Sequence, residues 1–208
     1  MDIKNMKIEK TIVLSKQSIA LMKTIDNFRE KKDLRRLYLS KIFYDFENKR
    51  IVATNGKALI SFDSNFITEL DDFNKTGFDC FIEYKAGLLI IYEKITERSI
   101  YPNYKRVIPE SSRLKNGNLF FDFSSKKSMY LEMVNICLYT ETPLNIEYLE
   151  KMKGYSYKIS VLNEMDRQTR PVVITEGNNK FFVILMPFEK SFEKTIMNEI
   201  PESALKEA

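Results

Sequence analysis

The residue types that could do chemistry are sparse in this chain, and their absence argues against several classes of enzyme. The 208 residues include no histidine, which excludes Ser-His-Asp and Cys-His nucleophiles, imidazole bases and histidine metal sites. Cys80 and Cys137 lie too far apart for a CxxC redox pair or a zinc knuckle. We interpret both as small buried residues of a protein from a reducing compartment.

Phosphate and metal sites are also poorly supported, and we expect no cofactor, no metal and no enzymatic activity. The six glycines are too dispersed for a GxGxxG or Walker loop. Glu69, Asp71 and Asp72 form an acidic cluster, for which a solvated charge run at a loop tip is preferred over a metal site. A Mg²⁺-dependent DNA-processing enzyme is the least favoured class, because no acidic set lies where strands would bring it together.

Composition predicts a globular protein of one or two domains, soluble and cytoplasmic. The chain is 44% hydrophobic and 30% charged, with a net charge of +4. The first ten residues contain no apolar signal segment, and no apolar run is long enough to cross a membrane. With so small a net charge, binding to a polyanion must depend on where the charges lie.

An amphipathic helix is predicted over residues 16–30, with Ser15 as its N-cap. Its apolar face consists of Leu21, Met22, Ile25 and Phe28. Its opposite face carries Lys16, Lys23 and Asn27, and it points either to solvent or to a polyanion.

The rest of the pattern predicts hairpins and one more helix, giving an α+β class of short helices on antiparallel sheets. Strands are expected at 37–46, 50–54, 59–62, 78–84, 88–92, 118–123, 129–138, 155–162, 171–175 and 180–186. Residues 64–76 read as a polar loop, 101–109 as an extended segment between prolines, and 111–117 as a polar turn at a domain boundary. The second helix is expected at 146–153, capped by Asn145 and followed by Gly154.

Four stretches, taken in order, resemble the middle and C-terminal domains of the bacterial β sliding clamp (DNA polymerase III beta subunit), the processivity subunit of the replicative polymerase. They are RIVATNGKALI (50–60), YPNYKRVIP (101–109), LNIEYLEKM (144–152) with the following PVVI (171–174), and FFVILMPF (181–188). Asn55, Lys57 and Ala58 depart from the family pattern, as do Phe188 and Glu189. The resemblance implies the DNA-clamp fold, with domains at 1–112 and 113–190 and a tail at 191–208; the family's first domain has no counterpart.

By that resemblance, the protein encircles duplex DNA without sequence specificity and tethers a polymerase and other proteins that carry clamp-binding motifs. The DNA-facing candidates are Lys16, Lys23, Asn27, Arg29, Lys31, Lys32, Lys151 and Lys153. An ordinary solvent-facing surface is the alternative for these residues. The implied peptide-binding pocket, between the two domains, consists of Leu39, Thr54, Gly56, Leu59, Pro102, Arg106, Val107, Ile184, Met186, Pro187 and Phe188.

The family builds a ring of six domains, so two domains per chain predict a ring of three copies joined head to tail through edge strands. The alternative function is a clamp-like regulatory protein that binds a polymerase or a clamp without encircling DNA. No membrane partner is expected.

Overall fold

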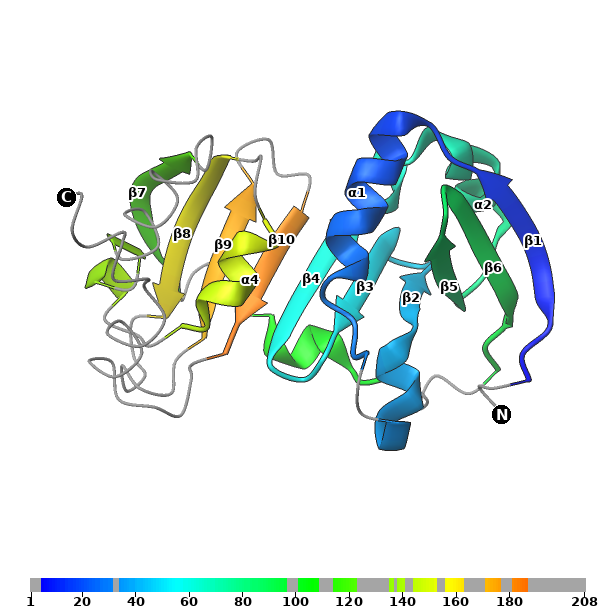
Figure 1. Cartoon of the computed structure of the whole chain (residues 1–208), viewed down its shortest axis with the longest axis horizontal. Coiled ribbons are helices and arrows are strands. Elements are labelled where there is room, and N and C mark those ends of the chain that lie inside the picture. Colours follow the sequence, from blue (N-terminus) through cyan, green and yellow to red (C-terminus); the bar gives the residue numbers. More distant parts are fainter. Residues whose placement is uncertain are drawn as a thin grey trace. The chain divides into compact units, whose positions relative to one another are not determined.

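The computed structural model describes residues 5–31, 34–96, 101–108, 114–122, 135–136, 138–140, 144–152, 156–162, 171–176 and 181–186. The chain divides into two compact units, Met1–Arg106 and Val107–Ala208. Each unit contains an antiparallel sheet and short helices, which confirms the predicted α+β class (Figure 1). The correspondence of these units to particular clamp domains stays a prediction.

The sheet of the first unit has the strand order β1-β6-β5-β2-β3-β4, and all its neighbours pair antiparallel. The strands are β1 (Ile8–Val13), β2 (Ile42–Asp45), β3 (Arg50–Thr54), β4 (Ala58–Asp63), β5 (Cys80–Lys85) and β6 (Leu88–Lys94). The predicted hairpin of β5 and β6 is confirmed. Its two-residue turn has positive φ at Ala86 (50°) and Gly87 (85°), the backbone that matches the twist of paired strands.

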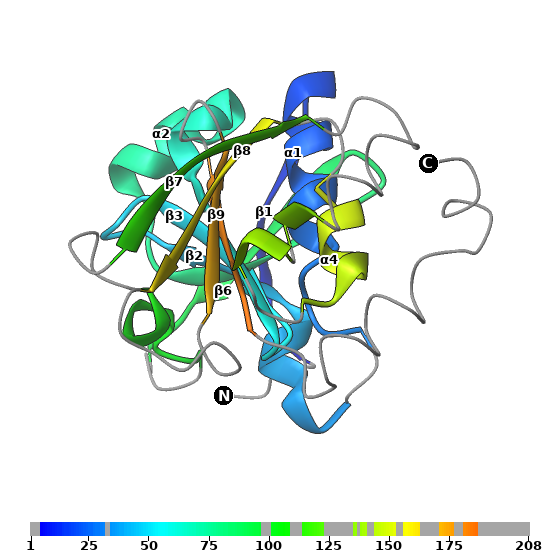
Figure 2. The ribbon, with the colours of Figure 1, turned by 90° about the vertical axis from the view of Figure 1, so that its left-hand side faces the viewer.

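Helix α1 (Lys16–Asp26) lies across the strands of this unit and packs on β3, β4 and β5 (Figure 1). The turned view shows it on one side of the sheet (Figure 2). Ser15 caps it by accepting a hydrogen bond from the Ser18 amide at 3.3 Å, as predicted. The predicted apolar face is confirmed, because all four of its residues are buried. The helix ends four residues earlier than predicted, and a tight turn carries Phe28 into the core.

Three local predictions for the first unit are wrong. Residues 64–76 are helical rather than a loop, with η2 (Ser64–Phe66), η3 (Thr68–Leu70) and α2 (Asp71–Thr76). Ile67, Leu70 and Phe73 recur every three residues and are all buried, and this spacing suits a helical turn among polar neighbours. Residues 34–40 form η1 (Leu34–Ser40) before β2, and 104–107 form η5 (Tyr104–Val107) instead of an extended segment.

One strand of the first unit was not predicted. β1 lies at the edge of the sheet and pairs only with β6 in the first unit. Its residues are exposed except for the half-buried Ile12, so it lacks the buried alternation that reveals an inner strand.

The sheet of the second unit has the order β10-β9-β8-β7, again antiparallel. Its strands are β7 (Leu114–Asp122), β8 (Ser156–Leu162), β9 (Val172–Glu176) and β10 (Phe181–Leu185). Helix α4 (Ile146–Glu150) is capped by Asn145, whose side chain accepts from the Glu147 amide at 2.9 Å, as predicted. Leu149 in the helix and Met152 in the turn after it are buried in the core of this unit.

Two predictions for the second unit are corrected. Part of the predicted polar turn at 111–117 belongs to β7, because pairing with β8 begins at Leu114. The register of the two strands shifts between Asn116 and Phe120, a stretch that includes Gly117. Residues 135–136 and 138–140 are helical, not part of a strand. The rest of the predicted strand at 129–134, Gly154 and the tail at 191–208 lie outside the described residues. Among the described residues, no helix is long and apolar enough to cross a membrane.

Candidate nucleic-acid and peptide interfaces

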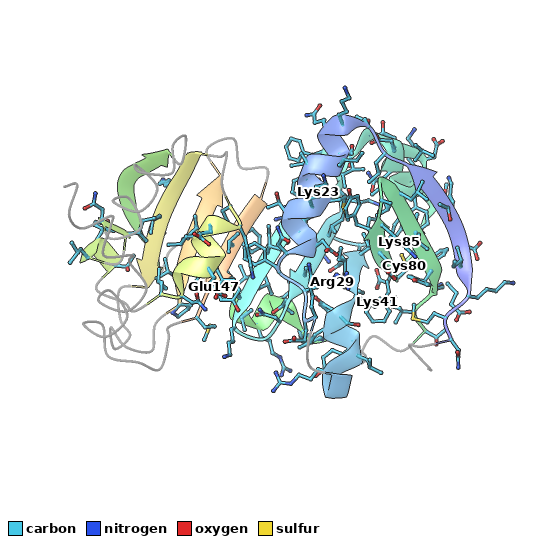
Figure 3. The ribbon with its side chains drawn as sticks, viewed as in Figure 1. Lys23, Arg29, Lys41, Cys80, Lys85 and Glu147 are labelled. Carbon is cyan, nitrogen blue, oxygen red and sulfur yellow. The ribbon has the colours of Figure 1, made fainter. Side chains whose placement is uncertain are left out.

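The outer face of α1 carries an exposed stripe that contains no acidic residue. Lys16, Ala20, Lys23 and Asn27 are all exposed and recur at helical spacing, and we call this set the α1 stripe. Lys23 is labelled on α1 in Figure 3. Within the described part of the chain neither lysine of the stripe forms an ion pair. Lys16 also occupies the first turn, where the helix dipole disfavours a positive charge, so a nearby polyanion would relieve that cost.

Two other predicted DNA-facing residues are engaged within the first unit. Arg29 donates from Nε to Asp26, and its guanidinium also donates to the Ser40 carbonyl at 2.8 Å. Lys31 lies 3.1 Å from the other carboxylate oxygen of Asp26. Arg29 thus ties the end of α1 to η1. Lys32 and Lys153 lie outside the described residues.

The predicted basic surface of the second helix is mixed in charge. Lys151 follows α4, and its ammonium lies 4.7 Å from the centre of the Tyr148 ring. Two exposed acidic residues, Glu147 and Glu150, accompany it on the helix (Figure 3 labels Glu147). The described part of α4 therefore offers phosphate a weaker attraction than the α1 stripe does.

The β3–β4 turn is held by side-chain hydrogen bonds. Thr54 Oγ1 donates to the Ala58 carbonyl at 2.7 Å and accepts from the Gly56 amide at 3.0 Å. Asn55 Oδ1 accepts from the amides of Lys57 and Ala58, both at 3.0 Å. An aspartate oxygen could accept in the same way, which gives a physical reason for Asn55 at the position where the family has an acid.

Gly56 has φ +86°, a conformation that favours glycine. A Cβ built there would lie 3.0 Å from the Arg36 guanidinium, so the side chain of Arg36, from η1, reaches this turn. Leu39, Thr54 and Leu59 are nearly inaccessible, with 3%, 8% and 5% of their surface exposed. These three predicted pocket residues are therefore mainly core, whereas Gly56, the predicted pocket residue in the turn itself, is exposed.

The segment 101–107 contains three more of the predicted pocket residues, Pro102 and Arg106 at the end of the first unit and Val107 at the start of the second. Tyr101 and Tyr104 are buried, whereas Pro102, Arg106 and Val107 are exposed, Val107 by 46%. The Tyr101 ring stacks on Phe43 with centroids 4.8 Å apart, and its hydroxyl lies 3.4 Å from the Val52 carbonyl oxygen. The second motif therefore packs directly against the first.

Four buried residues at this place were missed by sequence reasoning: Asp45, Asp79, Tyr101 and Tyr104. A cavity of about 210 Å³ lies between the segment 101–105 and the sheet, lined by Phe43, Asp45, Asp79, Tyr101, Pro102, Asn103, Tyr104 and Lys105. The available signal was the pair of tyrosines flanking Pro102 and Asn103, because an aromatic residue in a proline-bounded segment needs a surface to cover it.

In the second unit, Ile184 is buried in β10, and Met186, just after the strand, is 42% exposed. Pro187 and Phe188 lie outside the described residues. A common pocket with the residues of the first unit stays a prediction.

In the acidic cluster of Glu69, Asp71 and Asp72, Glu69 forms hydrogen bonds at the start of α1. Glu69 accepts hydrogen bonds from the Ser15 amide and from the Ser18 hydroxyl, the latter at 2.7 Å. Burial opposes its ionisation, but these hydrogen bonds outweigh burial and lower the pKa of Glu69 to about 2. Asp71 and Asp72 are exposed, in the first turn of α2. No group of three metal-ligating side chains occurs among the described residues.

Cys80 is buried in β5, as predicted, and burial raises the pKa of its thiol. Cys137 lies outside the described residues.

Of the comparisons with known proteins, only the one with solved structures gives matches, and those described below are sliding clamps. The structure is similar to the beta clamp of Helicobacter pylori bound to a DNA ligase peptide (TM-score 0.46, 13% identity, 88% of this chain and 66% of that chain). It is likewise similar to the DNA polymerase III subunit beta of Pseudomonas aeruginosa (TM-score 0.49, 13% identity, 87% of this chain and 66% of that chain). A third similar structure is the sliding clamp of Bacillus subtilis (TM-score 0.49, 12% identity, 89% of this chain and 66% of that chain). No protein-family model and no curated protein sequence matches the chain.

The chain thus spans 66% of the length of each of these three clamps. These three structures are sliding clamps, the proteins that the four sequence motifs also resemble.

Proposed function

We propose that this protein is a DNA sliding clamp, which encircles duplex DNA and tethers a polymerase or another enzyme through a short peptide. The observation that supports the proposal most strongly is the packing of two motifs distant in sequence. Residues 50–60 and 101–109 both resemble the clamp family, and the Tyr101 hydroxyl and the Val52 carbonyl bring them together. Of these two motifs, Gly56, Pro102 and Arg106 are exposed on the first unit.

The α1 stripe supplies the surface for DNA. A clamp needs contacts with phosphate that are weak and independent of sequence, so that the ring slides. Two lysines that form no ion pair with any described residue, and an asparagine, lie on a helical stripe without acids and meet that requirement, because lysine ammoniums attract phosphate through water without fixed geometry.

Closure of a ring would use the sheet edges. β1 leaves one of its edges without a partner in the first unit, and it exposes Ile8 by 53% and Val13 by 75%. β7 ends the strand order in the second unit. An exposed strand edge is a template for pairing with another chain, and we propose that β1 of one copy pairs with β7 of the next, three copies closing the ring.

Retention on DNA tests the encircling function. A closed ring should stay on circular DNA in high salt and slide off linear DNA, whereas a protein bound only by charge is lost from both. Light scattering after size exclusion should give the mass of a trimer. A monomer that binds the peptide but is lost from circles would instead support a clamp-like regulator that does not encircle DNA.

Peptide binding tests the tethering function. We expect a fluorescent copy of the DNA ligase peptide seen with the Helicobacter pylori clamp to bind with about micromolar affinity, the range for two small apolar anchors after the cost of ordering. A scrambled peptide of the same composition is the control, and equal binding of both would contradict the proposal.

A further inference from the structure

One buried carboxylate joins three parts of the first unit. Asp45, at the end of β2, is only 5% exposed. Its Oδ1 accepts from the amide and side chain of Asn48, at 3.0 and 2.8 Å. Its Oδ2 accepts from the Tyr104 hydroxyl at 2.7 Å. The β2–β3 turn and the segment 101–107 are thus tied to one side chain.

Among the described residues, the other side-chain contacts of the segment 101–107 are those of Tyr101 with Phe43, Phe81 and the Val52 carbonyl. η5 is a single short turn, whose internal bond runs from the Arg106 amide to the Asn103 carbonyl at 3.2 Å. The buried residues of the segment are Tyr101 and Tyr104, and the two residues between them, Pro102 and Asn103, line the 210 Å³ cavity. Ring packing on Phe43 holds the Tyr101 end of the segment, whereas Pro102 and Asn103 border the cavity, so the hydrogen bond from Tyr104 to Asp45 fixes where the other end lies.

We infer that Asp45 is a positioning residue, which holds Tyr104 so that Pro102, Arg106 and Val107 are presented in the geometry that binds a peptide. The inference rests on the proposed tethering function. Asp45 touches no peptide itself; it acts through the Tyr104 hydroxyl.

The protonation states suit this role. Burial opposes the ionisation of Asp45, but hydrogen bonds from Asn48 and Tyr104 outweigh burial, so its pKa lies below the usual value. Burial first, and then the hydrogen bond to Asp45, raises the pKa of Tyr104, which therefore stays a neutral donor. Lys105, 3.9 Å from Asp45 Oδ2, adds a weak attraction from the same segment. The bond is a charge-assisted one, and these are stronger than neutral ones.

The test removes one oxygen atom. Tyr104→Phe keeps the ring and deletes only the donor to Asp45. Tyr92→Phe is the control, because the Tyr92 hydroxyl donates to Glu83 at the same distance, 2.7 Å, elsewhere on the sheet; it also accepts from Lys41 Nζ at 3.1 Å. Both variants should lose similar thermal stability. Only Tyr104→Phe should weaken binding of the fluorescent DNA ligase peptide, by about five- to tenfold, a part of what a hydrogen bond to a charged group supplies.

Hydrogen exchange at the Arg106 amide gives a second measurement that needs no peptide. It should quicken in Tyr104→Phe and remain unchanged in Tyr92→Phe, since the loosened segment opens more often. Equal peptide affinity and equal exchange in the two variants would overturn the inference.

Failure of the proposed function is a separate result. If the unmodified protein does not bind the peptide, tethering through this segment fails, while the exchange of Arg106 still decides whether Asp45 positions it. If Tyr104→Phe does not fold, Asn48→Ala replaces it. This change removes the two bonds that the exposed Asn48 side chain donates to Asp45 Oδ1 and Oδ2, both at 2.8 Å, and keeps the bond from the Asn48 backbone amide. It should quicken Arg106 exchange and weaken peptide binding about twofold, and no change in either would overturn the inference.

Discussion

The two helices predicted to face DNA, α1 and α4, share an inner face and differ in their outer one. Each buries apolar side chains against its own unit, and each begins at a polar N-cap, Ser15 or Asn145. On the outside, α1 exposes lysines without acids, whereas α4 exposes Glu147 and Glu150 beside Lys151. Burial of an apolar stripe thus defines where a helix lies, and only its exposed charges define what it could bind.

Reversing the charge of the α1 stripe should have the largest effect. In the double variant Lys16→Glu and Lys23→Glu, we expect at least about a tenfold loss of DNA affinity near physiological salt, because two phosphate contacts become repulsive. The slope of log affinity against log salt should fall by about 2. Fluorescence anisotropy with a labelled duplex over a salt series measures both.

The control makes the same change of net charge at Lys75 and Lys94, which are exposed outside α1. It should leave the salt slope near that of the unmodified protein. Equal losses in the two double variants would mean that net charge, and not the stripe, attracts DNA.

The stability that Glu69 adds at the N-terminus of α1, where it accepts from Ser15 and Ser18, should depend on pH more than the stability added by the α4 cap. Glu69 has a depressed pKa of about 2, so its stabilisation is full above the usual value of 4.5 and is lost as the pH falls through 2. Glu69→Gln should cost about 1 kcal/mol at pH 7, reduced by solvent screening, and almost nothing near pH 2. Urea unfolding at several pH values measures the difference.

Asn145 caps α4 with a neutral side chain, so Asn145→Ala should cost about 1 kcal/mol without that change between pH 7 and pH 2. Asp71→Asn, at an exposed neighbour of Glu69, should change stability by less than about 0.5 kcal/mol. A pH-independent effect at Glu69 would remove the distinction between the two caps.

The smallest effect is expected at Lys151. Its ammonium lies over the Tyr148 ring and beside acidic neighbours, so Lys151→Ala should weaken DNA binding by less than about twofold. The same anisotropy titration measures this. A loss as large as that of the α1 double variant would place both helices on the DNA-binding surface.

Elements with a strong local pattern could be predicted from the sequence, whereas an edge strand and several short helical turns could not. The apolar spacing of α1, its Ser15 cap and the β5–β6 hairpin could be predicted, because each depends on neighbours within a few residues. The edge strand β1 and the helical turns at 64–76 were missed. An edge strand has no buried face, and short helical turns carry too few residues for a periodic signal.

The candidate site divides in the same way. Sequence alone determined the class of the fold, the lysine face of α1 and the motifs that resemble sliding clamps. Only the tertiary structure decided that Arg29 donates to the Ser40 carbonyl, that Leu39 and Leu59 are core, and that Asp45 accepts from the Tyr104 hydroxyl. The physical reason is range: helical and strand periodicity act over a few residues, whereas Asp45 and Tyr104 are 59 residues apart and meet only when the sheet has formed.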